Sequence, residues 1–363
     1  MRAIVWRENG RLERTDVWPE PAVGEREVLV RVRAAGVCAT DLHMVSGRLR
    51  FASPPWVLGH ELAGTVERVG SEVAGWRVGD RVVVDPVVGC GQCPMCQSGR
   101  KHHCPAGGEL GTTLPGGGYG EFVVARPGNL YRLPDTLTYA EGAMMEPLNC
   151  TLGAIERVCG LAGSRVAVFG AGPAGLLFAQ LAQAYGASMV TAIDRREEPL
   201  ALARRLGADE IALAAAAAGT GTTGAETIGA ETIGAGTTGM KELFAGRPPF
   251  EVTIEASGSE AGVRACIEHV APGGTVVLYG LHGAGVPTID SDRIVAKDLT
   301  VVTCTSAPLL WEKGIRLVEA GKVNVRDIVS LRVPFGEAEE VLNGLVSGTR
   351  RTIKAMLTEE LTS

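Results

Sequence analysis

Hydrophobic and polar positions follow two different patterns along the chain. Up to about residue 145, apolar and polar residues alternate in short Val-rich runs such as EVLVRVRAAGV, LAGTVERVG and RVGDRVVVDPVV, and Gly, Pro and Asp separate the runs. Alternation with a period of two is typical of half-buried β-strands. We therefore predict that the first part of the chain is rich in β-structure.

From about residue 147, short apolar runs alternate with segments of helical periodicity. The runs RVAVFG, MVTAID, EVTIEAS and TVVLYG are predicted as buried strands, and PAGLLFAQLAQAYG, EEPLALARRLG and AGVRACIEHV as helices. This alternation is typical of a parallel, doubly wound sheet with helices on its faces. The predicted fold class is α/β, and the tail from about residue 303 is expected to complete the first region.

One segment, at about 212–239, does not fit either pattern. Five alanines, Ala214 to Ala218, precede the units GTGTT, GAETI, GAETI and GAGTT at 219–238. A solenoid would need larger apolar repeats to bury a core, so we predict a low-complexity surface insert. Only MKELFAG then remains as a candidate short helix before the next strand.

Composition restricts the classes of function. The 363 residues are too many for one ordinary core, and 45% hydrophobic with 21% charged residues is typical of a globular protein. A net charge of −6 without a basic block argues against nucleic acid or an anionic membrane as partner. The N-terminus lacks an apolar leader and no run of 18 apolar residues occurs, so we expect a cytoplasmic protein.

Four of the nine cysteines are crowded into one stretch, CGQCPMCQSGRKHHC, at residues 90–104. Cys90, Cys93, Cys96 and Cys104 would close all four positions around a tetrahedral Zn²⁺ and leave none for a substrate, so this metal would be structural. Free loop thiols would be an unusual exposure of reactive groups, and a nucleic-acid zinc ribbon would have separated pairs and basic surroundings. The stretch therefore predicts a structural zinc lobe.

A glycine-rich turn follows the first strand of the second region. In VAVFGAGPAGLLFAQ, Gly170, Gly172 and Gly175 form a G-x-G-x-x-G pattern between a strand and a helix, with Pro173 and Ala174 inside it. Such a turn holds a pyrophosphate at the helix N-terminus. Asp194 ends the next strand and would accept the ribose hydroxyls, which favours NAD, whereas the following Arg195 and Arg196 could instead hold the 2′-phosphate of NADP.

Four further residues upstream and downstream of the lobe have side chains of the kind that bind zinc. Cys38 stands in GVCATDLH, His60 and Glu61 in GHELAG, and Glu146 in MEPLN. A catalytic zinc takes about three protein ligands and keeps one position open. Taken singly, each of these residues also has an ordinary structural interpretation, so the prediction depends on their combination with the lobe and the glycine turn.

These motifs together resemble the zinc-dependent medium-chain dehydrogenase/reductase family, the alcohol dehydrogenase superfamily. The resemblance covers the chain in order except for about 212–239, and Glu146 is similar to the polyol (sorbitol-like), glucose and threonine dehydrogenase branch. It implies a GroES-like β-rich catalytic domain at 1–147 and 303–363, with the lobe at 90–104, and a Rossmann domain at 148–302. Where sorbitol-like enzymes carry an arginine and an aromatic residue for the polyol, this chain has TCTSAP at 303–308.

The resemblance also implies roles for individual residues. Cys38, His60 and Glu146 would surround a catalytic zinc, directly or through water, with Glu61 as an adjacent or exchanging ligand, and Thr40 and His43 would form the proton relay. Loops that follow two strands on the carboxyl edge of the sheet should border the cofactor. Their residues are Ala256, Ser257, Gly280, Leu281 and His282.

The predicted function is therefore NAD(P)-linked oxidation of a secondary alcohol, in a polyol, sugar or hydroxy-amino acid, by hydride transfer. Two zinc ions per chain, a small-molecule substrate and a homodimer or homotetramer are expected. A non-catalytic redox sensor that binds zinc and nucleotide is the rival of another class, but a sensor has no use for a proton relay beside an open zinc. A quinone or enoyl reductase on the same scaffold would lack the zinc ligands.

Overall fold

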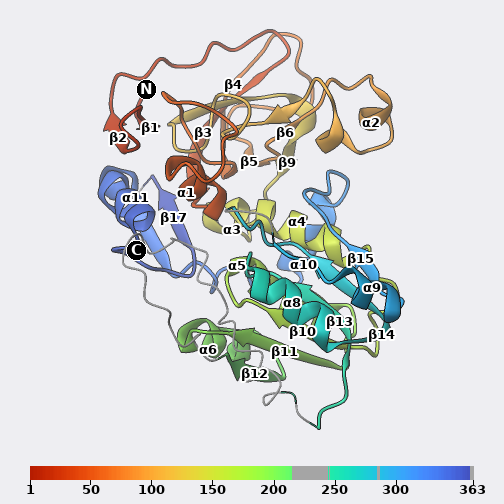
Figure 1. The fold of residues 1–363 in the computed structure, drawn as a ribbon. Helices are drawn as coiled ribbons and strands as arrows, with labels where there is room; N and C mark the ends of the chain where they lie inside the picture. Colours follow the sequence, from red (N-terminus) through yellow and green to blue (C-terminus); the bar gives the residue numbers. More distant parts are fainter. Residues whose placement is uncertain (215–243, 245, 284–286, 360–363) are drawn as a thin grey trace. The chain divides into compact units, whose positions relative to one another are not determined.

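The computed structural model describes residues 1–214, 244, 246–283 and 287–359 (Figure 1). Most of the predicted insert at 212–239 lies outside these residues, and so does the predicted helix MKELFAG except for Phe244 and Gly246. The chain divides into two compact units. Unit 1 consists of Met1–Asn149, Ser306–Glu319 and Val325–Ser363, and unit 2 consists of Cys150–Thr305 and Ala320–Asn324.

Unit 1 is built on a largely antiparallel sheet with the strand order β16-β17-β3-β4-β5-β9, in which β8 also pairs with β3. Two small two-stranded sheets, β1-β2 and β6-β7, complete its β-structure. The strands are β1 (Ala3–Trp6), β2 (Leu12–Thr15), β3 (Val28–Gly36), β4 (Glu61–Val69), β5 (Arg81–Val84), β6 (Val87–Val88), β7 (Gly108–Glu109), β8 (Phe122–Ala125), β9 (Leu130–Arg132), β16 (Leu331–Pro334) and β17 (Ala355–Thr358).

The predicted period-two alternation is only partly observed in unit 1. Strand β3 is buried at both ends and half-buried in the middle, because it is a central strand that pairs with β4, β8 and β17. The helices of this unit are short. They are α1 (Ala39–Val45), α2 (Pro94–Gln97), α3 (Tyr139–Ala143), α10 (Trp311–Glu319), α11 (Ala338–Ser347) and the 3₁₀ turns Lys101–His103, Pro127–Asn129 and Phe335–Glu337; α4 (Met145–Ile155) continues from unit 1 into unit 2.

In its described residues, unit 2 contains a parallel six-stranded sheet with the order β12-β11-β10-β13-β14-β15. Its strands are β10 (Arg165–Phe169), β11 (Met189–Asp194), β12 (Glu210–Leu213), β13 (Phe250–Glu255), β14 (Val270–Leu278) and β15 (Thr300–Val302), and its helices include α5 (Pro173–Ala184), α6 (Glu197–Arg205), α8 (Glu260–His269) and α9 (Ser291–Ala296). The order reverses at β10, whose neighbours are β11 and β13. A crevice for a ligand is expected at the carboxyl ends of strands beside such a reversal.

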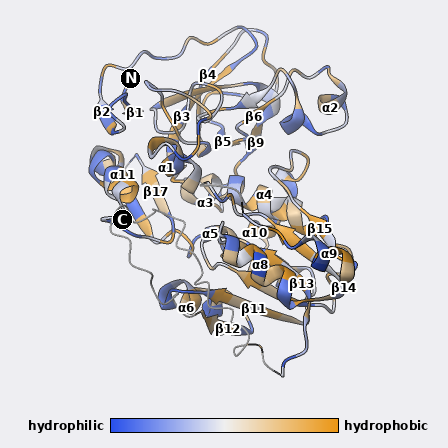
Figure 2. Ribbon diagram, viewed as in Figure 1, coloured by the Kyte–Doolittle hydropathy of each residue, from blue (hydrophilic) through white to orange (hydrophobic). Residues whose placement is uncertain are grey.

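Local sequence explains why these elements begin where they do. Buried apolar runs form the strands, and Figure 2 shows β11 mostly in the hydrophobic colour. Helix α5 begins with Pro173, whose missing N–H costs nothing in the first turn, and the Ser259 side chain caps α8. The predicted α/β class is confirmed. Within the described residues, no helix is both long and apolar enough to cross a membrane.

Candidate functional site

Cys38, His60 and Glu61 come together in unit 1. One ligand atom from each lies within 4.8 Å of the others. The pairing of β3 with β4 causes this, because Gly36 lies opposite Glu61 and the chain then leads to Cys38 at the start of α1. His60 and Glu61 are buried and Cys38 is half-buried, so Cys38 is the most exposed of the three.

His60 is oriented by a buried carboxylate. Its Nδ1 lies 3.4 Å from Asp41 Oδ1, which leaves Nε2 as the nitrogen for a metal. Burial opposes the charged imidazole, but the negative charges of Asp41 and Cys38 outweigh it and raise the pKa of His60 well above its usual value. A metal at Nε2 would displace that proton.

Glu61 is paired with a buried lysine that sequence analysis did not single out. Lys354 Nζ donates to Glu61 Oε1 at 2.6 Å and to the Val37 carbonyl at 3.0 Å. Burial lowers the pKa of Lys354, but the charges of Glu61, Cys38 and Glu146 outweigh burial and raise it. Glu146 is therefore close enough to Lys354 to act on its charge, although it is not one of the three residues whose ligand atoms lie within 4.8 Å.

Thr40 and His43 lie on α1, directly after Cys38. The Cys38 thiol lies 3.6 Å from the Thr40 hydroxyl. His43 is buried, and burial together with the positive charge of Arg48 lowers its pKa. Its Nδ1 makes no hydrogen bond to the residues that the structure describes. In the neutral imidazole, this nitrogen can therefore accept a proton.

The four thiols of the lobe also meet. Cys90, Cys93, Cys96 and Cys104 have sulfur atoms within 4.8 Å of one another. Backbone N–H groups of Cys90, Cys93 and Cys96 donate to sulfur at 3.3–3.5 Å. The N–H groups of Gln92 and Cys93 lower the pKa of Cys90 to about 6, while desolvation raises the pKa of Cys96 to about 11.

The lobe is tied to the sheet of unit 1 by a pair of charges in which Asp85 is buried and Lys101 is half-buried. Lys101 Nζ lies 2.7 Å from Asp85 Oδ2, and Arg126 donates to the Gly89 carbonyl at 2.7 Å. Four cysteine sulfurs, bound as thiolates, would fill the tetrahedral shell of a closed structural zinc. One thiolate, one imidazole and one carboxylate, the last two each with a buried charged partner, fit a zinc site that keeps a position for substrate.

The glycine turn of unit 2 has the shape that the sequence predicts. A Cβ on Gly175 would lie 1.8 Å from the Gly170 carbonyl oxygen, so this position needs glycine for close packing. A Cβ on Gly172 would meet none of the described atoms within 4 Å. Internal packing therefore does not require glycine at 172, and the space left there fits a pyrophosphate at the N-terminus of α5.

Asp194 ends β11 beside this turn. Its Oδ2 accepts the Ala171 N–H at 2.7 Å and its Oδ1 accepts the Arg196 N–H at 2.9 Å. The Arg196 side chain also faces it, with Nε 3.7 Å from Oδ1. The carboxylate thus helps to hold the glycine turn in place, a role that sequence analysis missed.

The predicted border loops after β13 and β14 are joined to each other. The carbonyl of Glu255 accepts the N–H groups of Tyr279 and Gly280, each at 3.1 Å, and its buried carboxylate accepts the Ser257 N–H at 2.8 Å. His282 Nδ1 lies 3.1 Å from the Gly258 carbonyl. The two loops are therefore joined by hydrogen bonds at the carboxyl edge of the sheet of unit 2, and they contain Ala256, Ser257, Gly280, Leu281 and His282.

Sequence reasoning missed Asp41, Tyr119, Lys354 and Glu255. The sequence did carry a signal for Asp41. In CATD, Cys38 is the N-cap of α1 and Asp41 stands three residues later, where its side chain accepts the Cys38 N–H at 3.0 Å. Lys354 lies far along the chain in an ordinary strand-like segment. No local pattern distinguishes it.

Known proteins match this chain over nearly its whole length. Residues 24–135 match the family model "Alcohol dehydrogenase GroES-like domain" and residues 173–320 match "Zinc-binding dehydrogenase". Sorbitol dehydrogenase of Macaca fascicularis is 32% identical over 338 residues, 92% of this chain and 90% of the relative.

Solved structures agree in fold. The 2R,3R-butanediol dehydrogenase of Bacillus subtilis is 26% identical with a TM-score of 0.80, covering 99% of both chains. A protein of Sinorhizobium meliloti 1021 solved with bound NADP is 29% identical with a TM-score of 0.80, covering 98% of both chains.

Fold, motifs and relatives thus define an oxidoreductase of the medium-chain class. The chain belongs to the zinc-dependent medium-chain dehydrogenase/reductase family, on its polyol dehydrogenase branch. It is an enzyme, a zinc-dependent, nicotinamide-linked alcohol and polyol dehydrogenase.

Proposed function

We propose that each chain holds two zinc ions with different tasks. Cys38, His60 and Glu61 hold the catalytic ion, with Glu146 beside them, and Cys90, Cys93, Cys96 and Cys104 hold a structural one. The observation that carries this proposal is the meeting of two separate ligand groups in unit 1. On this reading Glu61 is a direct ligand, and Glu146 acts through water or through Lys354.

The residues around the catalytic group would orient the alcohol and move its proton. When bound, zinc supplies a Lewis acid that polarises the hydroxyl, and the nicotinamide accepts hydride. The Thr40 hydroxyl would accept the hydroxyl proton of the substrate while it gives up its own, and neutral His43 would take up the released proton as the base of the relay, since burial lowers the pKa of His43 and favours its neutral form. Burial of His60 and Glu61 excludes water from the inner side of the group.

Unit 2 would hold the cofactor at the carboxyl edge of its sheet, and unit 1 would be the catalytic domain. Gly170, Gly172, Pro173, Ala174 and Gly175 receive the pyrophosphate, and the joined loops with Ala256, Ser257, Gly280, Leu281 and His282 border the nicotinamide half. Asp194, which faces the glycine turn, favours NAD. Arg195 and Arg196 follow it and could hold the 2′-phosphate of NADP, the cofactor that is bound in the similar protein of Sinorhizobium meliloti 1021.

The proposed substrate is a secondary alcohol of a polyol. The names of two relatives contain sorbitol and 2R,3R-butanediol, and both compounds carry more than one hydroxyl group. A cytoplasmic location and a homodimer or homotetramer remain part of this proposal.

Metal analysis of the purified protein together with a substrate panel tests the proposal. We expect two zinc ions per chain by native mass spectrometry, and NADH production with polyols rather than with simple primary alcohols. One zinc ion or none in protein prepared without chelators would contradict it. NAD should give the higher kcat/KM.

The Asp194→Ala variant tests the choice of cofactor. It should narrow the preference for NAD over NADP by about tenfold, because it removes repulsion of the 2′-phosphate. Asp209→Ala is a matched control, since Asp209 also accepts a backbone N–H, that of Val190 at 2.7 Å, but precedes β12 at the opposite end of the sheet. A wild type that prefers NADP would assign the choice to the arginines instead.

A further inference from the structure

Tyr119 is a fully buried residue whose hydroxyl group is directed at the candidate zinc site. Its side chain has no exposed area, and its hydroxyl donates to Asp41 Oδ2 at 2.8 Å. The residue stands in GGGYGEF, a loop far from Asp41 in sequence. Packing alone does not need this hydroxyl, since phenylalanine has the same ring.

Asp41 receives donors on both of its oxygens. Oδ2 accepts the Cys38 N–H at 3.0 Å as well as the Tyr119 hydroxyl, and Oδ1 accepts the Gly59 N–H at 3.3 Å and faces His60 Nδ1 at 3.4 Å. The Tyr119 hydroxyl thus fixes the oxygen that does not face His60. A carboxylate held in this way cannot rotate without losing a hydrogen bond in a buried site.

Tyr119 also holds the backbone that leads into His60. Its N–H donates to the Leu58 carbonyl at 2.9 Å. A Cβ on Gly59, whose φ is +94°, would lie 2.7 Å from the Tyr119 ring. The ring therefore packs against the residue directly before His60 while the hydroxyl binds the carboxylate beside the imidazole.

We propose that Tyr119 is a positioning residue of the zinc site, which fixes the His60 imidazole through Asp41 on one side and through Gly59 on the other. This inference rests on the proposed role of Cys38, His60 and Glu61 as zinc ligands. The Tyr119 hydroxyl contributes to metal retention without touching metal, substrate or cofactor. Partners of metal ligands typically change metal affinity by about 10–100-fold, and a residue one step further out should fall at the lower end of that range.

The Tyr119→Phe variant, measured with zinc itself, is the test. Zinc-loaded protein is mixed with a chromophoric chelator, and Cys38→Ser identifies which of the two zinc pools belongs to the catalytic site. In Tyr119→Phe we expect that pool to be lost to the chelator at about tenfold lower chelator concentration, with the lobe pool unchanged. In kinetics, kcat should fall while the KM for NAD stays the same.

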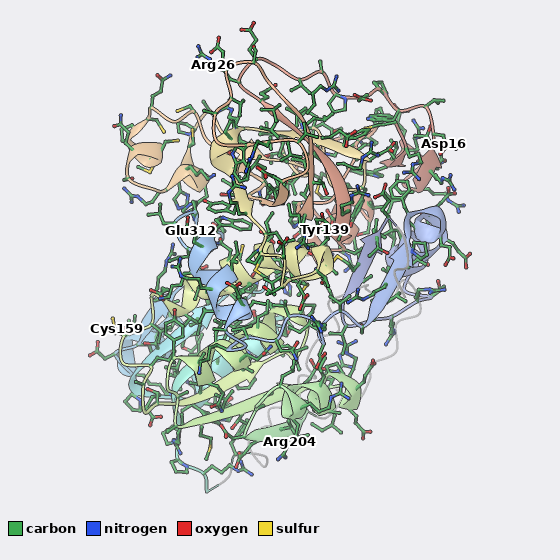
Figure 3. All side chains as sticks on the ribbon, turned by 180° about the vertical axis from the view of Figure 1, so that it is seen from behind. Asp16, Arg26, Tyr139, Cys159, Arg204 and Glu312 are labelled. Atoms are coloured by element: carbon green, nitrogen blue, oxygen red, sulfur yellow. The ribbon has the colours of Figure 1, made fainter. Side chains whose placement is uncertain are left out.

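Tyr139→Phe is the matched control. It also removes a phenol hydroxyl from unit 1, one that lies 2.9 Å from the Thr65 hydroxyl, and Figure 3 labels this residue. Zinc retention in this control should equal that of the wild type. Equal loss of the catalytic pool in both variants would mean a general loosening of the fold and would overturn the inference.

A double-mutant cycle keeps the inference testable if Tyr119→Phe lowers stability. Asp41→Asn should weaken zinc retention more than Tyr119→Phe, and adding Tyr119→Phe to it should cost little more, because the hydroxyl acts through the carboxylate. Additive losses, or unchanged or tighter zinc binding in Tyr119→Phe, would overturn the role of Tyr119 while the proposed site stands. If Cys38→Ser left both zinc pools in place, the proposed site itself would fail, and this inference with it.

Discussion

The two candidate zinc centres of unit 1 differ in where their ligands come from and in what surrounds them. The lobe takes Cys90, Cys93, Cys96 and Cys104 from one short loop, and three of the four are half-buried. The other centre takes Cys38 from the start of a helix and His60 and Glu61 from the start of a strand. Its two buried ligands have charged partners that are themselves buried, Asp41 and Lys354.

A metal ion that stabilises the fold and a metal ion that takes part in the reaction need different surroundings. Thiolates in a short loop need only backbone N–H groups around them, because four negative sulfurs close the shell of a zinc ion. A centre with an open position needs groups that hold the remaining ligands in place when substrate enters. In unit 1 these groups are Asp41 on α1 and Lys354 directly before β17, and both are charged and buried.

Cys38→Ser should have the largest effect and should separate the two centres. Serine is favoured at the N-cap of a helix, which Cys38 occupies in α1, so the fold should persist. Turnover should fall by at least about 100-fold through loss of the catalytic zinc. Activity and zinc content, measured together, check this. The control is Cys159→Ser, which changes an exposed cysteine (Figure 3) and should change neither. Retention of both zinc ions in Cys38→Ser would break the comparison.

Cys96→Ser should show the opposite profile. It should remove the structural zinc and lower stability by about 3 kcal/mol, or roughly 5–10 °C in Tm. Folded protein should keep most of its turnover, because no residue of the lobe belongs to the group at Cys38. Thermal unfolding and initial rates at low temperature check this. Loss of turnover in fully folded protein would show that the lobe takes part in the chemistry.

Lys354→Met tests the fully buried pair Lys354–Glu61, which is compared below with the half-buried Lys101 beside Asp85. It leaves Glu61 buried without its partner, which should destabilise the metal-free protein by about 3–5 kcal/mol. Added zinc should restore part of this loss, since zinc would neutralise Glu61. Urea unfolding with and without zinc measures both quantities.

Lys101→Met is the control for that experiment and should cost less. Burial already raises the pKa of Asp85, so this carboxyl can take up a proton when Lys101 is removed. If added zinc restored the same share of stability in both variants, the two centres would differ only in the spacing of their ligands along the sequence.

Arg48→Gln should have the smallest effect, confined to the pH profile of the centre with the relay. Burial first, and then the charge of Arg48, lower the pKa of His43, so activity that needs neutral His43 should be lost only on the acid side. Without the arginine charge the pKa of His43 rises, and the acid limb of kcat should move to higher pH. Arg50→Gln, at an exposed arginine two residues further on, should leave the profile unchanged. A shift toward lower pH would contradict the relay assignment.

Local sequence was enough for the longer elements of unit 2 and for the lobe. The strands β10, β11, β13 and β14 and the helices α5, α6 and α8 were predicted because each has its own apolar periodicity, and β10, α5 and β11 lie where the runs RVAVFG, PAGLLFAQLAQAYG and MVTAID place them. The short elements β12, α9 and β15 were not predicted. The lobe was predicted because its four ligands lie within a single loop. The sequence also places Gly172 and Asp194, since a turn between a strand and a helix fixes their neighbours.

Only the tertiary structure decided how the other centre is built. The sequence indicated four candidate ligands, Cys38, His60, Glu61 and Glu146. Strand pairing brings the first three together, whereas Glu146 lies close enough to Lys354 to act on its charge. Tyr119 and Lys354 reach the site from segments that are distant in sequence from Cys38 and His60, and both act through buried contacts, Tyr119 on Asp41 and Lys354 on Glu61. A contact between distant segments leaves no periodic trace in either of them, because each segment fits its own strand or loop equally well without it. The sequence therefore determined which ligand types are present, and packing determined which buried charges hold them.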